Sequence, residues 1–169
     1  MTRPHPWPGR SARGSVILPL PWSFVPPLAA TLDLPEAPLV RKAELHLTLL
    51  SRPEADAAAA TLPESEWCAW FDRRDWDLRL TDRWFLLAAK DAGHTVRSVI
   101  AEIDCDALNV FRREFGYAAA VPLEDTLPHV TLWVDGKATG IGLASLAEFD
   151  ARCVRRLTAR ERQSGIATG

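Results

Sequence analysis

The tetrad His-Leu-Thr-Leu at residues 46–49 recurs as His-Val-Thr-Leu at residues 129–132. In both copies apolar residues alternate with polar ones, which is the pattern of a β-strand with one buried face. Successive side chains of a strand point to opposite faces, so His46 projects beside Thr48 and His129 projects beside Thr131. Each strand therefore presents one imidazole and one hydroxyl on the same side.

Short strands and helices are expected around the two tetrads. Short connections between most strands favour an α+β fold with antiparallel sheet over a doubly wound parallel sheet. Alternation of apolar and polar residues predicts strands over 16–20, 43–50, 76–81, 84–89, 95–103 and 129–134. Caps and apolar spacing predict helices after Ser51, after Pro63, over 106–115 with Gly116 ending it, and over 146–157.

The ends of the chain differ in composition from the middle. Residues 1–14 are rich in Pro, Arg and Gly and are expected to form a flexible arm, whereas the polar stretch 158–169 is expected to fray. Residues 15–157 then form a single domain. The apolar run 16–30 follows three arginines, but four prolines interrupt it, so we do not expect a signal peptide. No stretch has the length of a membrane span.

The composition limits the classes of partner. The chain has 169 residues, 47% of them hydrophobic and 25% charged, with a net charge of −2, as is ordinary for a globular protein. Proteins that coat long nucleic acids usually carry a basic surplus, so only a small basic cleft for one phosphate or a short oligonucleotide is expected. The three cysteines lack disulfide or metal spacing, which predicts reduced thiols and a cytoplasmic location. We also expect a monomer.

The residue types in the two tetrads suit phosphate chemistry. Two imidazoles can divide acid–base work near neutral pH, one taking a proton from a nucleophile while the other protonates a leaving oxygen. A threonine hydroxyl on the same face can donate a hydrogen bond to a phosphoryl oxygen. The histidines show no His-x-His or His-x-x-x-His spacing, and Thr is a poor metal ligand, so neither a metal nor another cofactor is expected.

Two other interpretations of the tetrads stay open from the sequence. A lone His-x-Thr in a strand is more often a satisfied polar pair than a catalytic one, and in that case the two imidazoles would not share a cleft. A binding module for a phosphorylated nucleotide or RNA end would need the hydroxyls but not two titrating imidazoles. The repetition of the whole tetrad favours a functional pair over unrelated polar residues.

With Pro128 before the second copy, the motifs His46-Leu47-Thr48 and His129-Val130-Thr131 resemble those of the two-histidine phosphoesterase superfamily. The family includes bacterial RNA 2′,3′-cyclic phosphodiesterases, also called 2′-5′ RNA ligases. The resemblance covers roughly residues 43–157. It implies a bilobed α+β fold in which two antiparallel sheets with flanking helices surround a central cleft, with the lobes related by pseudo-twofold symmetry.

The resemblance also implies an activity. It predicts metal-independent cleavage of 2′,3′-cyclic phosphates or 2′-5′ linkages in nucleotides or short RNA. His46 and His129 would be the acid–base pair, in an order that the sequence leaves open, and Thr48 and Thr131 the phosphate ligands. Trp133 lies two residues beyond Thr131, so simple alternation places it on the same face. There it would stack on a base, with core packing as the alternative.

Overall fold

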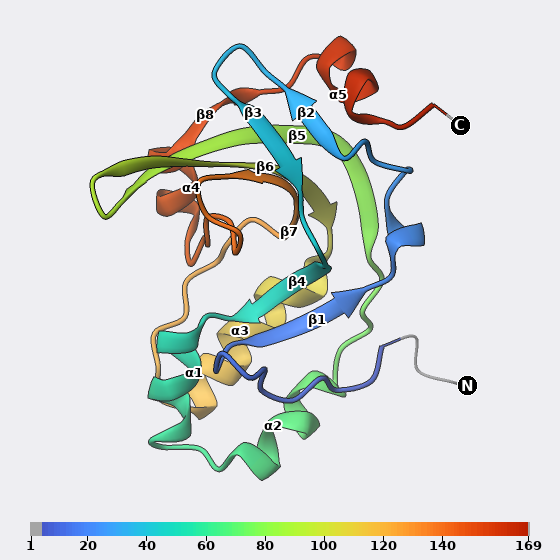
Figure 1. Ribbon diagram of the computed structural model, residues 1–169. Coiled ribbons are helices and arrows are strands. Elements are labelled where there is room, and N and C mark those ends of the chain that lie inside the picture. Colours follow the sequence, from blue (N-terminus) through green and yellow to red (C-terminus); the bar gives the residue numbers. More distant parts are fainter. Residues whose placement is uncertain (1–4, 169) are drawn as a thin grey trace.

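The computed structural model describes residues 5–168 and has an α+β fold with two antiparallel sheets (Figure 1). The smaller sheet pairs β1 (Val16–Leu20) with β4 (Leu45–Leu50). The larger sheet has six strands in the order β2 (Thr31–Asp33), β3 (Pro38–Arg41), β7 (His129–Asp135), β6 (His94–Asp104), β5 (Arg79–Asp91) and β8 (Cys153–Arg156). The expected fold class and antiparallel pairing are therefore confirmed.

Five α-helices lie within residues 5–168, and they flank the two sheets (Figure 1). Helices α1, α2 and α3 lie on the side of the two-stranded sheet, α4 contacts β5, and α5 contacts β2. One short 3-10 turn follows β1 at Trp22–Phe24. The helices are α1 (Arg52–Ala59), α2 (Glu64–Phe71), α3 (Asp106–Ala118), α4 (Leu146–Arg152) and α5 (Ala159–Gly165).

Local signals set most of these boundaries. Ser51 and Glu54 form the capping box that begins α1, which confirms the expected cap. Gly116 does not end α3: the helix continues to Ala118, and a Cβ at Gly116 would lie 2.7 Å from the carbonyl oxygen of Val121. Glycine at this position therefore lets the backbone at Val121 approach the helix closely, and it does not end the helix.

Two other expectations about the elements are wrong. The separate strands expected at 76–81 and 84–89 form one strand, β5, whose pairing with β6 is irregular between Leu80 and Trp84. The helix expected over 146–157 ends at Arg152, because the chain then extends as β8 to pair with β5.

The chain between β3 and β4 joins the two sheets and positions the motif strands. Arg41 of β3 pairs with Trp133 of β7, and the amide of Lys42 still donates to the Leu132 carbonyl at 2.8 Å. Beyond Lys42 the chain leaves β7 and pairs with β1 as β4 (Figure 1). The strands β4 and β7 therefore remain neighbours although they belong to different sheets.

Part of each terminal segment contacts the rest of the domain. The Trp7 and Phe71 rings pack with their centroids 5.4 Å apart, and Arg10 forms ion pairs with Asp56 and Glu64, so residues 5–14 are attached to the domain. The part of the expected arm before residue 5 lies outside the described residues.

Part of the segment expected to fray forms a helix. Thr158 and Glu161 form a capping box that begins α5, and Ile166 forms a β-bridge with Leu28. Within residues 5–168, no helix combines the length and the apolarity needed to span a membrane.

Candidate functional site

The side chains of His46, Thr48, His129 and Thr131 line one cavity of about 320 Å³. They reach it from β4 and β7, whose apolar residues pack into the core behind them. The alternation in the sequence therefore predicted the faces correctly. The interpretation in which the two imidazoles do not share a cleft is wrong, because strands from two different sheets bring them together.

A backbone carbonyl fixes the hydrogen position on His129. The Nδ1 atom lies 2.8 Å from the carbonyl oxygen of Leu127. A carbonyl oxygen only accepts, so Nδ1–H donates, and Nε2 of the neutral ring keeps its lone pair. Burial lowers the pKa of His129, although the bond to Leu127 opposes the shift. The ring is thus neutral near pH 7 and able to accept a proton at Nε2.

His46 lies in a different electrostatic environment. Burial lowers its pKa most, the positive charge of Lys42 adds to the shift, and the carboxylate of Glu44 opposes it. Its Nδ1 lies 3.6 Å from a Glu44 oxygen, and no group in residues 5–168 hydrogen-bonds that nitrogen. An anion bound in the cleft would favour the protonated form of His46, because its negative charge would oppose the effects of burial and of Lys42.

The two threonine hydroxyls have capacity for a ligand. Thr48 and Thr131 are half-buried, and neither hydroxyl forms a hydrogen bond with another group in the described chain. Gly140 packs closely against Thr131: a Cβ there would lie 3.1 Å from the threonine methyl and 3.2 Å from the Ser98 hydroxyl. The φ of Gly140 is 77°, a conformation that favours glycine. The segment after β7 therefore closes over the second motif.

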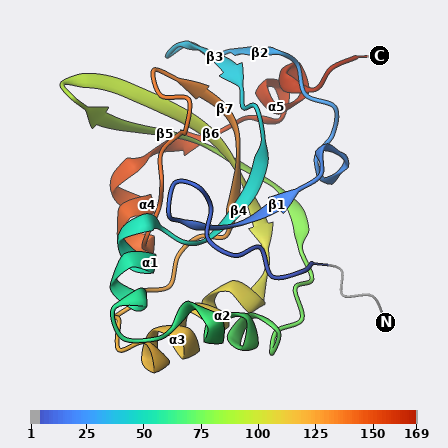
Figure 2. The same cartoon turned by 60° about the horizontal axis from the view of Figure 1, so that its bottom comes forward.

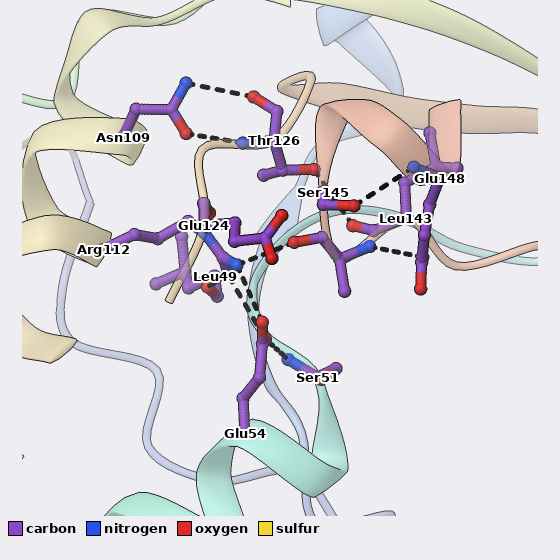
Figure 3. A network of polar contacts seen from close by, with 11 residues as sticks. Leu49, Ser51, Glu54, Asn109, Arg112, Glu124, Thr126, Leu143, Ser145 and Glu148 are labelled. Atoms are coloured by element: carbon purple, nitrogen blue, oxygen red, sulfur yellow. Dashed lines mark hydrogen bonds and ion pairs between the residues drawn. The ribbon is translucent and has the colours of Figure 1, made fainter. Parts of the chain in front are cut away.

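Arg112 of α3 holds the wall of the cavity together, as Figure 3 shows. Its guanidinium donates to both carboxylate oxygens of Glu54, at 2.7 and 3.2 Å, and to the carbonyls of Leu49, Glu124 and Ala144 at 2.9–3.0 Å. These bonds use all five of its N–H groups. Arg112 is therefore a positioning residue, and none of its donors is left for a ligand.

The same network extends along the segments that Arg112 contacts (Figure 3). The side-chain amide of Asn109 donates to the Thr126 carbonyl and accepts from the Thr126 amide, both at 3.0 Å. Ser145 caps α4 by accepting from the Glu148 amide, and Glu148 accepts from the Ala144 amide at 2.8 Å. The loop before β7 is thus held by a side chain of α3, and the loop after β7 is held by the first turn of α4.

A larger cavity of about 660 Å³ adjoins the first and shares His46, Thr48 and Thr139 with it. The sequence interpretation missed its residues Lys42 and Glu44. Alternation could have found them, because every second residue from 42 to 48 faces this cavity. Arg13 also lines it, and no local pattern in the sequence indicated that.

Trp133 does not lie on the cleft face, which corrects the expectation from simple alternation. Thr131 pairs with Ile100 and Trp133 pairs with the adjacent Val99, so β7 carries an extra residue at this point. Such a bulge turns the following side chain to the other face. Trp133 is fully buried, and its Nε1 donates to the Ala29 carbonyl at 3.1 Å.

The described residues contain no group of three or more His, Cys, Asp or Glu side chains that could hold a metal ion. Comparisons of the chain with protein-family models, with curated proteins and with solved structures found no match. Membership of the two-histidine phosphoesterases therefore stays a prediction, and function has to be inferred from the site itself.

Proposed function

We propose that the cavity between β4 and β7 is the active site of a metal-independent phosphodiesterase of the two-histidine kind. Its substrates would be 2′,3′-cyclic phosphates or 2′-5′ linkages in nucleotides or RNA ends. The observation that carries the proposal is the convergence of His46, Thr48, His129 and Thr131 on one cavity from two sheets. Two imidazoles and two hydroxyls can supply the acid, the base and the phosphate ligands of an in-line displacement at phosphorus.

The proton positions suggest which imidazole is the base. His129 holds its hydrogen at Nδ1 against the Leu127 carbonyl, so its Nε2 accepts a proton from the attacking water. The water oxygen forms a bond to phosphorus while the bond from phosphorus to one ribose oxygen breaks. Protonated His46, with Glu44 near its Nδ1, gives a proton to that leaving oxygen. The products are a phosphomonoester and a free ribose hydroxyl.

The threonines would bind the phosphoryl group during this step. Each hydroxyl lies beside one imidazole and lacks a hydrogen-bond partner in the described chain, so both are able to donate to the equatorial oxygens. A hydroxyl held in position by packing costs little reorganisation as negative charge builds up in the transition state. The close contact of Gly140 with Thr131 supports such a fixed position.

The resemblance also includes two lobes related by a pseudo-twofold axis, which we propose only for the strands at the cleft. Its support is that each sheet supplies one His-x-Thr strand to the same cavity. The sheets themselves are unequal, with two and six strands. The proposed symmetry therefore relates the motif strands β4 and β7 and leaves the outer strands unmatched.

A substrate screen in the presence of EDTA tests the proposal. The purified protein should hydrolyse at least one 2′,3′-cyclic mononucleotide or 2′-5′ dinucleotide, and chelation should leave the rate unchanged because the imidazoles supply the acid and the base. Product chromatography would also identify which ester bond breaks. Absence of turnover on every member of the panel, or its loss with EDTA, would contradict metal-independent cleavage.

Binding without cleavage is the second candidate. Burial lowers the pKa of both imidazoles, which favours this candidate in one respect, because two neutral rings can hydrogen-bond a ligand without exchanging protons. Affinity of the His46→Asn and His129→Asn variants for a nucleoside 2′-monophosphate separates the two candidates. Retained affinity, together with a parent protein that turns over nothing in the screen, would favour the binding module.

The pH dependence follows from the same shifts. Catalysis needs one neutral and one protonated imidazole, and burial holds both pKa values below the ordinary value of about 6.5. Below both values both rings are charged, and above both they are neutral. The bell-shaped profile of kcat/KM, set by the pair together, should therefore peak on the acid side of about pH 6.5.

Bound phosphate adds negative charge beside His46 and raises its pKa, so the optimum of kcat should lie at higher pH than that of kcat/KM. Steady-state rates between about pH 4.5 and 8.5 would measure both profiles on the two sides of the histidine range. A kcat/KM that rises steadily through this range would show that a protonated imidazole is not required.

A further inference from the structure

The cavity of about 660 Å³ beside the proposed active site carries a surplus of positive charge. It shares His46 and Thr48 with the smaller cavity and extends away from His129. Its charged lining residues are one carboxylate and four cations: Glu44, Arg13, Lys42, Arg52 and Lys137. The protein as a whole is slightly acidic, so this local surplus is a property of the cleft.

Two of the four cations are already paired. Arg52 lies 3.6 Å from Asp56, and Lys137 lies 3.0 Å from Asp91. In the described chain, by contrast, neither Arg13 nor Lys42 forms an ion pair or a side-chain hydrogen bond. These two side chains therefore have donors available for a ligand in the cavity.

Lys42 is the more unusual of the two, because this residue is only 6% exposed. Burial and the nearby charge of Arg13 lower its pKa, while Glu44 opposes the shift without a hydrogen bond. Lys is almost never this buried unless it is paired, so an ammonium that reaches the cavity from a buried residue without a bonded acceptor is unfavourable. An anion in the cavity would remove this cost.

Arg13 is held over the cavity by an ordered loop. Arg10 forms ion pairs with Asp56 and Glu64, and its Nε donates to the Gly14 carbonyl at 3.0 Å. Gly14 has a φ of 86°, which favours glycine and turns the chain back toward β1. Figure 2 shows this N-terminal loop lying over β4 near α1. The loop thus places Arg13 at the cavity that Lys42 also lines.

We propose that Arg13 and Lys42 form a second phosphate-binding subsite. The substrate would then carry two phosphate groups: the ester between the imidazoles, and a 5′-phosphate one ribose away. This inference deepens the proposed function and rests on it for the position of the first phosphate. Phosphate suits the pair because a guanidinium fork and an ammonium together provide charge-assisted hydrogen bonds to several of its oxygens.

Binding of two product analogues, measured by calorimetry, tests the subsite without requiring turnover. Adenosine 2′,5′-bisphosphate should bind at least about tenfold more tightly than adenosine 2′-monophosphate, because only its second phosphate receives the charge-assisted hydrogen bonds of Arg13 and Lys42. In Arg13→Gln and in Lys42→Met this ratio should fall toward one, with little change for the monophosphate.

Two control variants distinguish binding at the subsite from the effect of overall charge and from the role of the catalytic residues. Lys90→Gln removes a cation that bonds Thr95 at the β5–β6 hairpin and should keep the full ratio. His46→Ala should weaken both ligands but also keep the ratio. If the protein cleaves no ester while its preference for the bisphosphate still depends on Arg13 and Lys42, the subsite is supported and the proposed reaction is wrong.

Two results would overturn the subsite. One is equal affinity of the two analogues for the unaltered protein. The other is a preference for the bisphosphate that survives both substitutions. Arg13 is exposed on a loop, so Arg13→Gln leaves the core intact and decides the question even if Lys42→Met, at a buried position, fails to fold.

Discussion

Replacing His129 with Ala is expected to lower kcat on the substrate found in the screen by about 10²–10⁴-fold, the usual contribution of a positioned general acid or base. The expectation rests on the bond between Nδ1 of His129 and the Leu127 carbonyl, which leaves Nε2 as the only acceptor of the neutral ring. His46→Ala should cause a loss of similar size, since it removes the proton donor for the leaving oxygen. Steady-state kinetics would measure both losses.

The matched control is His94→Ala, which removes an exposed imidazole at the β5–β6 hairpin and should leave kcat unchanged. Thermal unfolding of each variant would show that the fold is retained. Because the two imidazoles act in one step, the double variant should be only slightly slower than either single variant. A single variant with near-normal turnover would refute the paired acid–base mechanism.

Replacing Arg112 with Met is expected to reduce the free energy of unfolding by about 3–5 kcal/mol, the range for breaking a buried ion pair by removing one partner. Arg112 is 2% exposed, and its loss would remove five hydrogen bonds to Glu54 and to the carbonyls of Leu49, Glu124 and Ala144, leaving Glu54 with the Ser51 amide. Denaturant unfolding at pH 7 would measure the change. Activity should also fall, because the affected segments form the cavity wall.

Arg113→Met is the matched control, since the neighbouring guanidinium is 61% exposed and lies 3.8 Å from Asp125. This surface substitution should change the free energy of unfolding by no more than about 0.5 kcal/mol. Equal destabilisation by the two substitutions would show that the Arg112 network does not hold the wall.

The effect of Arg112→Met should also depend on pH. Burial raises the pKa of Glu54, but the hydrogen bonds and charge of Arg112 outweigh it and hold the pKa below the ordinary value. A lowered carboxyl pKa stabilises the fold above the unfolded-state value and loses that contribution as pH falls through the folded-state value. The difference between the two proteins should thus shrink below about pH 4.

Much of the local structure was predictable because neighbouring residues cause it. Alternation around His46 and around His129 gave two strands with the correct faces, and the Ser51 cap gave the start of α1. The same alternation would have included Lys42 and Glu44 if it had been followed toward the N-terminus. The fold class also followed from short connections between strands.

The alternation of residues failed to predict side-chain faces where pairing with a neighbouring strand is irregular. At Trp133 the bulge against β6 turns the side chain into the core, and no residue of β7 by itself signals that bulge. Gly116 looked like a helix stop, yet the close approach of Val121 explains it, and that contact depends on how the chain returns after α3.

The sequence by itself determined that two strands each carry an imidazole and a hydroxyl on one face, because strand geometry is local. Only the tertiary structure decided that these faces share a cavity, since β4 and β7 belong to different sheets that separate beyond Lys42. It also decided that Arg13 and Lys42 lie beside the site, whereas the N–H groups of Arg112 all bond other groups of the protein. Those assignments depend on contacts between segments far apart in the chain, which no local pattern specifies.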